Sequence, residues 1–389
     1  MTGLCPLLMV DFEARKGKIF MAFSDLSAER SMVEAEWKIS SVTEPLLNWY
    51  HLSARTMPWR SEPSPYRVWL SEIMLQQTRV EAVIPYFLRF VRAIPDISAL
   101  AAASEEQLHK LWEGLGYYSR VRNLQKAAKQ IMERYDGALP PSYELLLDLC
   151  GIGPYTAGAI ASIAFGIPVP AVDGNVLRVL SRIFASEADI GAATVKKEYQ
   201  ELLYRTMPQD KPGDFNQALM ELGATVCLPN GKPKCEDCPI AFGCLGYQQG
   251  NPTLYPVKAE KKPRRTELKT VLVLCTPQGV LMHKRPSSGL LAGLWEFPNL
   301  NGHLTKQEVK DYLKSRGIQE KSIEPLKPTK HIFTHIEWQM TGYYITRAEI
   351  RPASDEAISG ITELEQTYTV PNAFAAYKKV LSERMKKKH

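Results

Sequence analysis

The spacing of apolar residues divides the chain into a helical part and a part rich in strands. From Glu34 to about Tyr247, apolar side chains recur at intervals of three and four residues, which is the periodicity of amphipathic helices. Asp and Ser residues stand where these runs begin, and Gly or Pro residues where they end, as at helix termini. The pattern predicts an all-α region over residues 34–247.

Towards the C-terminus the pattern becomes that of strands. Leu268–Thr276 is rich in Val and Leu, Pro277–Gly279 has the composition of a turn, and Val280–His283 resumes the apolar run. Lys306–Arg316 predicts a helix, and further apolar runs after it predict more strands. We therefore expect a mixed α+β domain, which we place at residues 270–384.

Segments without a core-forming pattern flank or separate the two domains. Residues 248–269 contain several prolines and a run of basic residues, which predicts a linker. Its charges favour a solvated tether, and a phosphate contact stays as the alternative. Residues 1–33 are expected to form a flexible N-terminal extension, and residues 385–389 a frayed basic tail.

Composition limits the function only loosely. A net charge of +6 permits an anionic partner such as nucleic acid but does not require one. The most apolar stretch, Gly158–Val172, contains prolines and is too short to span a bilayer, so no membrane association is expected. The N-terminus lacks the basic region of a signal peptide. We expect a monomeric, cytoplasmic protein of bacterial type, associated with the nucleoid.

Four of the seven cysteines lie close together. Four thiolates so near one another need a shared cation, and a reducing compartment suits them better than disulfides do. A single compact run favours an iron–sulfur cluster. Zinc remains an alternative, although structural zinc sites usually show two C-x2-C pairs, and chance is the least favoured explanation. The four are Cys227, Cys235, Cys238 and Cys244, spaced C-x7-C-x2-C-x5-C.

A glycine-containing turn and a later aspartate form a second pattern. Leu149–Ala157 predicts a helix end, a tight turn through Gly151 and Gly153, and a new helix with proline near its start. Free N–H groups at such a helix start can bind a DNA phosphate, although a lone G-x-G is also an ordinary corner. Asp173 then opens another helix. It is either a simple N-cap or a carboxylate kept ionised by the helix N–H groups, and both roles can coexist.

Together these segments resemble the helix-hairpin-helix and Gly/Pro-Asp motif of the DNA glycosylase superfamily. The cysteine spacing is similar to that of endonuclease III-type glycosylases, with one extra residue between Cys227 and Cys235. The resemblance implies a six-helix barrel followed by a cysteine loop that holds one [4Fe–4S] cluster per chain. Bifunctional members carry a lysine, which attacks the sugar, where this chain has Tyr155. Tyr155 therefore indicates a monofunctional glycosylase.

Glu72 is the second candidate carboxylate. A glutamate on an amphipathic helix is usually a surface residue, whereas one that faces a pocket has a raised pKa and can act as an acid. The strings P-W-R at Pro58–Arg60 and S-E-x-M-L-Q-Q-T at Ser71–Thr78 resemble those of MutY-family adenine DNA glycosylases. The resemblance covers residues 45–245 almost continuously and extends into the C-terminal domain.

This resemblance implies a role for each candidate residue in the excision of adenine from 8-oxoguanine:adenine or guanine:adenine mispairs in duplex DNA. Glu72 would protonate adenine N7 and later handle the water, and Asp173 would stabilise the sugar cation. Tyr155 and Asn175 would position the carboxylates and the sugar. The residues implied to line the adenine pocket are Arg55, Trp59, Arg60, Leu75 and Gln217. Those implied to wedge beside the opposing purine are Gln77, Thr78, Leu115 and Tyr117.

The second domain resembles a Nudix domain at Gly289–Pro298. A Nudix hydrolase then needs an R-E-x-x-E-E helix to hold Mg²⁺, and Asn299–Gln307 lack that run, so we expect binding without hydrolysis. The resemblance implies that Phe333, Thr334 and His335 read 8-oxoguanine, where the family commonly has F-S-H. From the residues alone, Phe333 would be a core residue and His335 a strand residue.

Two other function classes remain as alternatives. An endonuclease III-like lyase acting on damaged pyrimidines is disfavoured by Tyr155 and by the extra domain. A non-enzymatic DNA-binding protein is disfavoured by the presence of both carboxylates, and a nucleotide-pool Nudix hydrolase by the missing carboxylate run. The sequence names no protein partner, such as a sliding clamp or a mismatch-repair protein.

Overall fold

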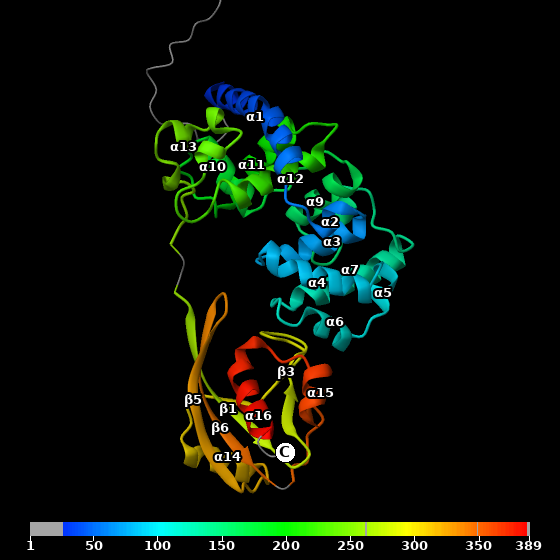
Figure 1. The fold of residues 1–389 in the computed structure, drawn as a ribbon, viewed down its shortest axis with the longest axis vertical. Coiled ribbons are helices and arrows are strands. Elements are labelled where there is room, and N and C mark those ends of the chain that lie inside the picture. Colours follow the sequence, from blue (N-terminus) through cyan, green and yellow to red (C-terminus); the bar gives the residue numbers. More distant parts are fainter. Residues whose placement is uncertain (1–25, 261–262, 348, 387–389) are drawn as a thin grey trace, which may run out of the picture. The chain divides into compact units, whose positions relative to one another are not determined.

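The computed structural model describes residues 26–260, 263–347 and 349–386 (Figure 1). Residues 1–25 of the expected extension and residues 387–389 of the expected tail lie outside the described residues. The chain forms two compact units, each built from segments that are distant in sequence. Unit 1 comprises Met1–Thr56, Pro141–Leu147 and Ile152–Glu260, and unit 2 comprises Met57–Pro140, Asp148–Gly151 and Lys261–His389.

Unit 1 is helical. Its core includes Leu46, Leu180, Leu203 and Phe215, which the helices bury between them. The first helix begins at Leu26, so residues 26–33 of the expected extension are helical. The helices are α1 (Leu26–Ser53), α8 (Tyr143–Leu147), α9 (Pro154–Phe165), α10 (Gly174–Ile183), α11 (Ala193–Thr206) and α12 (Pro212–Thr225), followed by the short η1 (Cys235–Asp237), η2 (Ala241–Gly243), α13 (Leu245–Gln248) and η3 (Pro252–Leu254).

The segment between α9 and α10 is held close to α9 because Gly158 has no side chain. A Cβ at this position would stand 2.4 Å from the carbonyl oxygen of Pro170. The same segment is fixed by the buried Asn216 of α12, whose side chain accepts from the Ala171 N–H (3.0 Å) and donates to the Val169 carbonyl (2.9 Å). These contacts set the path of the chain that enters α10.

Unit 2 contains a helical layer and a mixed sheet. The helices of the first part bury large aromatic side chains, among them Trp69, Phe87, Phe90 and Trp112. Ser64, Asp96 and Ser104 cap three of these helices through their side chains, as N-cap residues do. The helices are α2 (Pro58–Ser61), α3 (Pro65–Leu75), α4 (Val80–Ala93), α5 (Ile97–Ala102), α6 (Glu105–Trp112) and α7 (Ser119–Arg134).

The sheet of unit 2 has strand order β3-β2-β1-β6-β5, with β4 paired to β1 and β7 paired to β2. The central β1 and β6 run parallel, and the other pairs are antiparallel. The strands are β1 (Arg265–Cys275), β2 (Val280–Lys284), β3 (Trp295–Glu296), β4 (Asn299–Asn301), β5 (Ser322–Ile332), β6 (Ile336–Thr346) and β7 (Glu356–Ser359). The accompanying helices are α14 (Lys306–Ser315), α15 (Ile361–Gln366), η4 (Asn372–Phe374) and α16 (Ala375–Lys386).

Alternate residues of β1 feed two separate cores. Val271 and Val273 pack with Tyr377 and Leu381 of α16, whereas Leu272 packs in the other cluster with residues of α14. This is the two-residue period of a strand covered by helices on both faces. The prediction of an α-helical region followed by an α+β domain is confirmed. The expected helix at 306–316 is α14, and β1 begins at Arg265, within the segment expected to be a linker.

Among the described residues, no helix has the length and apolar character needed to cross a membrane.

Candidate active site

Asp173 caps helix α10 in unit 1. Its Oδ1 accepts hydrogen bonds from the backbone N–H groups of Asn175 (2.9 Å) and Val176 (2.8 Å), and its Oδ2 accepts one from the Asn175 side-chain amide (2.7 Å). These N–H groups are among those left without partners at the start of a helix. The N-cap that the sequence indicates is therefore present, and both carboxylate oxygens are held in place.

The surroundings of Asp173 raise the pKa of its carboxyl group. Burial is the largest cause, and it outweighs the hydrogen bonds from Val176 and Asn175 and the charge of Arg178, which lower the pKa. The helix N–H groups do favour the ionised form, as the sequence indicates, but burial outweighs them in the net shift. An ionised Asp173 is a poorly hydrated anion, and such an anion interacts strongly with a positive charge that develops beside it.

Arg178 connects this turn to the cysteine segment. Its guanidinium donates to the Asn175 side-chain oxygen (2.9 Å), the Gly223 carbonyl (2.7 Å) and the Cys227 carbonyl (2.8 Å). One turn later, Arg182 donates to the Cys227 sulfur (3.1 Å). The sequence analysis gave neither arginine a role, although their spacing of four residues places both on one face of α10.

The four clustered cysteines lie together in unit 1 and form no disulfide. Burial, with the neighbouring thiols of Cys227, Cys244 and Cys235, raises the pKa of Cys238 to about 12. The described residues contain no set of three or more His, Cys, Asp or Glu side chains arranged around a single metal ion. Four thiolates so close together would repel one another, so ionisation of all four needs a cationic centre. Four sulfur donors in one segment are the ligand set that an iron–sulfur cluster takes.

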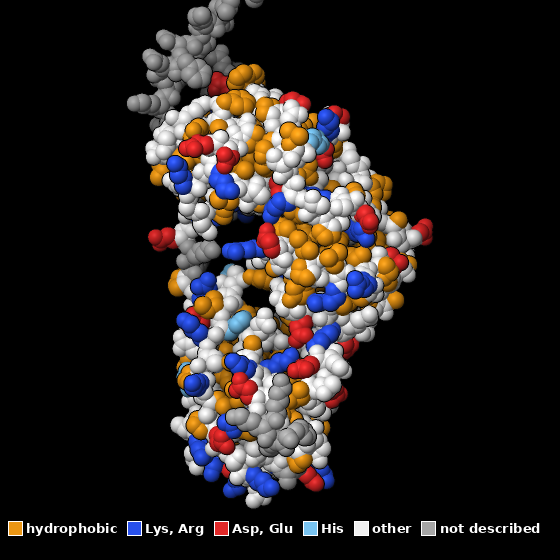
Figure 2. Space-filling view, viewed as in Figure 1, with side chains coloured by type: hydrophobic (Ala, Val, Ile, Leu, Met, Phe, Trp, Pro, Cys, Tyr) orange, Lys and Arg blue, Asp and Glu red, His pale blue; other side chains and the backbone are white. Residues whose placement is uncertain are grey.

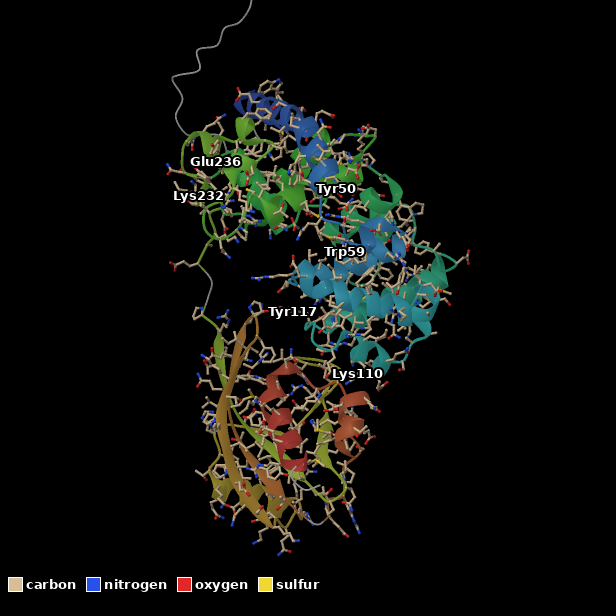
Figure 3. All side chains as sticks on the ribbon, viewed as in Figure 1. Tyr50, Trp59, Lys110, Tyr117, Lys232 and Glu236 are labelled. Atoms are coloured by element: carbon tan, nitrogen blue, oxygen red, sulfur yellow. The ribbon has the colours of Figure 1, made fainter. Side chains whose placement is uncertain are left out.

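The loop between Cys227 and Cys235 contains a residue with a left-handed backbone. Gly231 adopts a left-handed conformation (φ 73°) between Cys227 and Cys235, a conformation that glycine tolerates without strain. Lys232 and Lys234 are exposed beside it, and Figure 3 shows Lys232 and Glu236 on this loop. We expect a loop of this kind to tolerate one more residue, because lengthening a surface loop costs little free energy.

Helix α12 contributes three features to the same region of unit 1. Glu221 is 2% exposed and pairs with Arg55, with 2.6 Å between Arg55 Nε and Glu221 Oε1. Met220 accepts a hydrogen bond from the Tyr155 hydroxyl (3.6 Å to sulfur). Gly223 lies against Asn175, because a Cβ there would stand 2.6 Å from the Asn175 Cβ. Glu221 and Gly223 were missed by the sequence analysis, and Gln217, on the same helix, is half-buried.

Glu72 belongs to α3 in unit 2 and is 6% exposed. The surface position usual for a glutamate on an amphipathic helix is therefore excluded. Trp59 is also buried and meets Phe87 edge-on, with ring centroids 5.2 Å apart. Arg60 and Leu75 are half-buried. A buried carboxyl group on a helix is a candidate for the acid role that the sequence suggests.

The residues expected to wedge into DNA differ in exposure. Gln77 and Tyr117 are exposed, and both adopt left-handed backbone conformations, with φ of 59° and 48°. Figure 3 shows the position of Tyr117. Thr78 is half-buried. Leu115 is only 7% exposed, so it packs within the unit rather than projecting from it. Two side chains of the expected set, Gln77 and Tyr117, therefore stand out at loop positions.

The loop of Phe333, Thr334 and His335 joins β5 to β6. Its base is closed by a bond from the Phe333 N–H to the Ile336 carbonyl (2.8 Å). Phe333 packs edge-on against Trp338, with ring centroids 5.0 Å apart, so its interpretation as a core residue holds in part. Thr334 and His335 are exposed, and the Thr334 hydroxyl lies 2.8 Å from that of Tyr117.

The hairpin glycines have the expected backbone. Gly151 is exposed with φ of 78°, and a Cβ there would clash with Asn123 at 2.7 Å. Gly153 is the N-cap residue of α9, and Pro154 takes the first helical position. Exposed N–H groups at this helix start are suited to a phosphate contact.

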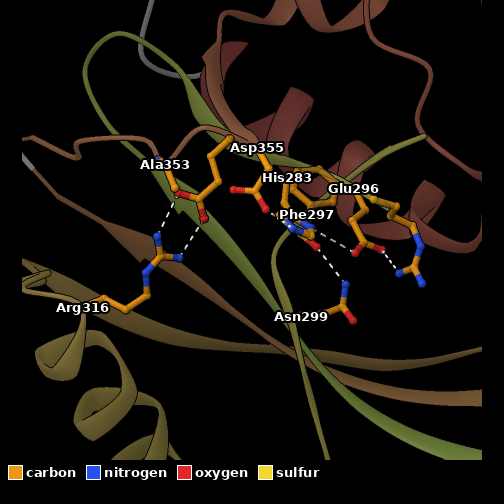
Figure 4. Close-up of polar contacts among 9 residues, drawn as sticks. His283, Glu296, Phe297, Asn299, Arg316, Ala353 and Asp355 are labelled. Carbon is orange, nitrogen blue, oxygen red and sulfur yellow. Dashed lines mark hydrogen bonds and ion pairs between the residues drawn. The ribbon is translucent and has the colours of Figure 1, made fainter. Parts of the chain in front are cut away.

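Glu296 lies in the segment that resembles the start of a Nudix box, and its carboxylate pairs with two basic side chains of the protein. Glu296 is 3% exposed and pairs with Arg285 (2.7 Å). It also pairs with His283 (3.4 Å), as Figure 4 shows. The hydrogen bond to Glu296 raises the pKa of His283. On the face of this domain drawn in Figure 2, basic and acidic side chains are interspersed.

Comparisons with known proteins now identify the family. Residues 70–205 match the HhH-GPD superfamily base excision DNA repair protein family, and residues 270–379 match the NUDIX domain family. The chain is 38% identical over 357 residues to the adenine DNA glycosylase of Mus musculus, covering 77% of this chain and 69% of that protein. The chain belongs to the adenine DNA glycosylase family. It is a base excision repair enzyme that acts on adenine in DNA, as the sequence predicts.

Further relatives agree with this assignment. The adenine DNA glycosylase of Arabidopsis thaliana is 37% identical over 346 residues, covering 75% of this chain and 55% of that protein. A solved thermostable thymine-DNA glycosylase aligns with a TM-score of 0.50 and 27% identity, covering 56% of this chain and 99% of that chain. The superfamily to which these glycosylases belong commonly carries an iron–sulfur cluster.

Asp173→Asn tests the electrostatic role of the capping carboxylate. We expect single-turnover excision of adenine to fall about 10²- to 10³-fold, the range seen when one preorganised electrostatic group is removed. Because the native pKa is raised, the parent enzyme loses stability as pH rises through that pKa, whereas asparagine does not titrate. The melting temperature of the variant relative to the parent should therefore rise as the pH is raised from acid to neutral. Asp311→Asn, an exposed change on α14, is the control. Full activity of the Asp173 variant would contradict this role.

Proposed function

We propose that this adenine DNA glycosylase removes adenine paired with 8-oxoguanine or guanine in duplex DNA and leaves an abasic site. The observation that carries the proposal is the contact between the Tyr117 and Thr334 hydroxyl groups, 2.8 Å apart. It joins an exposed aromatic of the helical layer to the loop of the Nudix-like domain, two positions implied by the family resemblance to meet the purine opposite adenine. Such a pair can stack on that purine and hydrogen-bond to it at once.

In this proposal the two carboxylates perform different steps on one flipped nucleotide. Glu72 donates a proton to adenine N7, the N-glycosidic bond breaks, and the bonding electrons leave with the neutral base. The sugar becomes an oxocarbenium ion, which the Asp173 carboxylate stabilises. A water molecule then adds to C1′ and gives its proton to the Glu72 carboxylate, which restores the acid. Asn175, which donates to Asp173, keeps that carboxylate oriented.

The remaining residues bind the base or limit the reaction. Tyr155 has no amine, so no Schiff base forms with the sugar and strand cleavage is not catalysed efficiently. The proposed adenine pocket comprises Arg55, Trp59, Arg60, Leu75 and Gln217. Arg55 is held in place by the buried Glu221. The N–H groups near Gly151 and Gly153 are proposed to bind a DNA phosphate.

On the opposite strand, Gln77 and Tyr117 are proposed to enter the stack where adenine has left, with Thr78 and Leu115 packed behind them. Thr334 and His335 are proposed to read the 8-oxoguanine edge, and Phe333 anchors their loop through its packing on Trp338. Exposed polar side chains on a loop with a buried anchor suit discrimination between two purines that differ by few polar atoms.

We further propose that Cys227, Cys235, Cys238 and Cys244 hold a [4Fe–4S] cluster. When bound, this group would supply a rigid, charge-neutralising centre for four thiolates. The chain's own contribution is the Arg182 guanidinium, which donates to the Cys227 sulfur, and the exposed Lys232 and Lys234, which suit a DNA backbone contact.

A cleavage assay tests the reaction. Duplexes that contain 8-oxoguanine:adenine, guanine:adenine or thymine glycol are incubated with the enzyme, with and without alkali. We expect breaks at adenine in the first two duplexes only after alkali, because an abasic site without lyase activity remains intact. Glu72→Gln should abolish them, and Glu133→Gln, an exposed change on α7, should not. Breaks without alkali, or at thymine glycol, would refute the proposed reaction.

The cofactor proposal predicts a coloured protein. Absorbance at about 400 nm, typical of iron–sulfur proteins, should accompany the purified chain. Cys238→Ser should remove that absorbance and lower the melting temperature, whereas Cys150→Ser, at a cysteine outside the cluster, should leave both unchanged. A colourless preparation with stoichiometric zinc would rule out the iron–sulfur assignment.

The lesion-reading proposal concerns one hydroxyl group. Thr334→Val keeps the shape of the side chain and removes its hydrogen bonds, so we expect the preference for 8-oxoguanine:adenine over guanine:adenine to fall by about tenfold, the effect of one hydrogen bond. Single-turnover rates on the two duplexes give the ratio. Thr266→Val, an exposed change on β1, is the matched control. An unchanged ratio would remove Thr334 from lesion recognition.

A further inference from the structure

Arg120, which none of the assigned roles includes, lies buried in the first turn of α7. Its side chain is 8% exposed, although arginine is rarely buried without charged partners. Its contacts are mainly to backbone carbonyls of two loops of unit 2. Burial lowers the pKa of Arg120 to about 10, so the guanidinium remains positively charged at neutral pH.

The first of these segments is the C-terminal end of α3 and the residue that follows it, Gln76. Arg120 Nη1 donates to the carbonyl groups of Ile73 (2.9 Å), Met74 (2.9 Å) and Gln76 (2.7 Å). These carbonyls belong to the last turn of a helix, where acceptors have no partner within the helix and the dipole is negative. A buried cation at this position therefore satisfies the end of the helix that carries Glu72.

The second loop joins α6 to α7. Arg120 Nη2 donates to the carbonyl groups of Leu115 (3.1 Å) and Gly116 (3.1 Å). The Gly116 carbonyl also accepts from the Trp112 indole N–H (3.1 Å). The guanidinium carbon lies 5.6 Å from the centre of the Tyr117 ring, within the range of a cation–π contact.

Two of these acceptors occupy equivalent places in their loops. Gln76 and Gly116 directly precede Gln77 and Tyr117, whose φ values of 59° and 48° are disfavoured for residues other than glycine. Each carbonyl belongs to the peptide group that precedes the left-handed residue. A hydrogen bond to that carbonyl therefore restrains the orientation of the peptide group and, with it, the φ of the next residue. One planar guanidinium thus restrains both residues, and a planar fork of donors does this better than the point charge of lysine.

We propose that Arg120 is a positioning residue that couples the two wedge loops, so that Gln77 and Tyr117 enter the duplex as one preorganised unit. The inference rests on the proposed wedge role of these two residues. Arg120 contacts neither adenine nor the sugar in this proposal, and it acts through the conformations of residues 77 and 117. Its effect should therefore fall on base extrusion, which a paired adenine requires and an unpaired adenine does not.

The test compares Arg120→Lys with the parent enzyme on two duplexes. One contains adenine opposite 8-oxoguanine, and the other contains adenine opposite a tetrahydrofuran abasic analogue, where the base is already unpaired. We expect the single-turnover rate on the paired duplex to fall at least about tenfold more than the rate on the unpaired one. Arg134→Lys, an exposed change on the same helix, should alter neither rate. Equal losses on both duplexes, or no loss, would overturn the inference.

Two further variants separate the possible failures. If Arg120→Lys folds poorly, as judged by its melting temperature, Trp112→Phe serves in its place. It removes the bond to the Gly116 carbonyl and reduces the aromatic surface under the Arg120 guanidinium, so we expect a paired-specific loss of smaller size. Tyr117→Ala and Gln77→Ala test the wedge itself on the same duplexes. If each of these two variants lost as much activity on the unpaired duplex as on the paired one, the wedge role would be refuted. If Tyr117→Ala and Gln77→Ala slowed excision mainly on the paired duplex but Arg120→Lys and Trp112→Phe did not, only the coupling by Arg120 would be refuted.

Discussion

The arrangement of unit 1 depends on a carboxylate that must be hydrogen-bonded and yet kept largely from water. Asp173 meets both conditions at the start of α10, where backbone N–H groups hold Oδ1 and the Asn175 amide holds Oδ2. The close approach at Gly158 and the hydrogen bond that Asn216 accepts from the Ala171 N–H fix the segment between α9 and α10, which leads to Asp173. Much of this local structure therefore serves to keep one poorly hydrated anion in a single orientation.

In unit 2 the opposite end of a helix is stabilised, since a buried cation meets carbonyl groups at a helix C-terminus. The last carbonyl groups of α3 are met by the buried Arg120, and the first N–H groups of α10 are met by Asp173. In both cases a side-chain charge satisfies backbone groups that a helix leaves without partners. Reactive and wedge residues then lie next to helix ends whose geometry is fixed by charge as well as by packing.

The sequence predicted well those features that rest on local pattern. The cap at Asp173, the turn at Gly151, the helix α14 and the strand β1 all follow from neighbouring residues. Contacts across long separations were not accessible. The pairing of Arg55 with Glu221 and the burial of Leu115 depend on which helices pack together. The net rise in the pKa of Asp173 was not accessible for the same reason, because burial is a tertiary property.

The absence of a side chain at Gly223 has a consequence for how inherited changes in this enzyme are interpreted. Glycine to alanine inside an exposed helix ordinarily stabilises it by up to about 1 kcal/mol, so a propensity-based score would class Gly223→Ala as benign. Here the added methyl group would press on Asn175, whose amide holds the capping carboxylate. A harmful allele can therefore arise at a position that contacts no nucleotide and changes no charge. A ranking of variants should include the residues that pack against those holding the reactive groups.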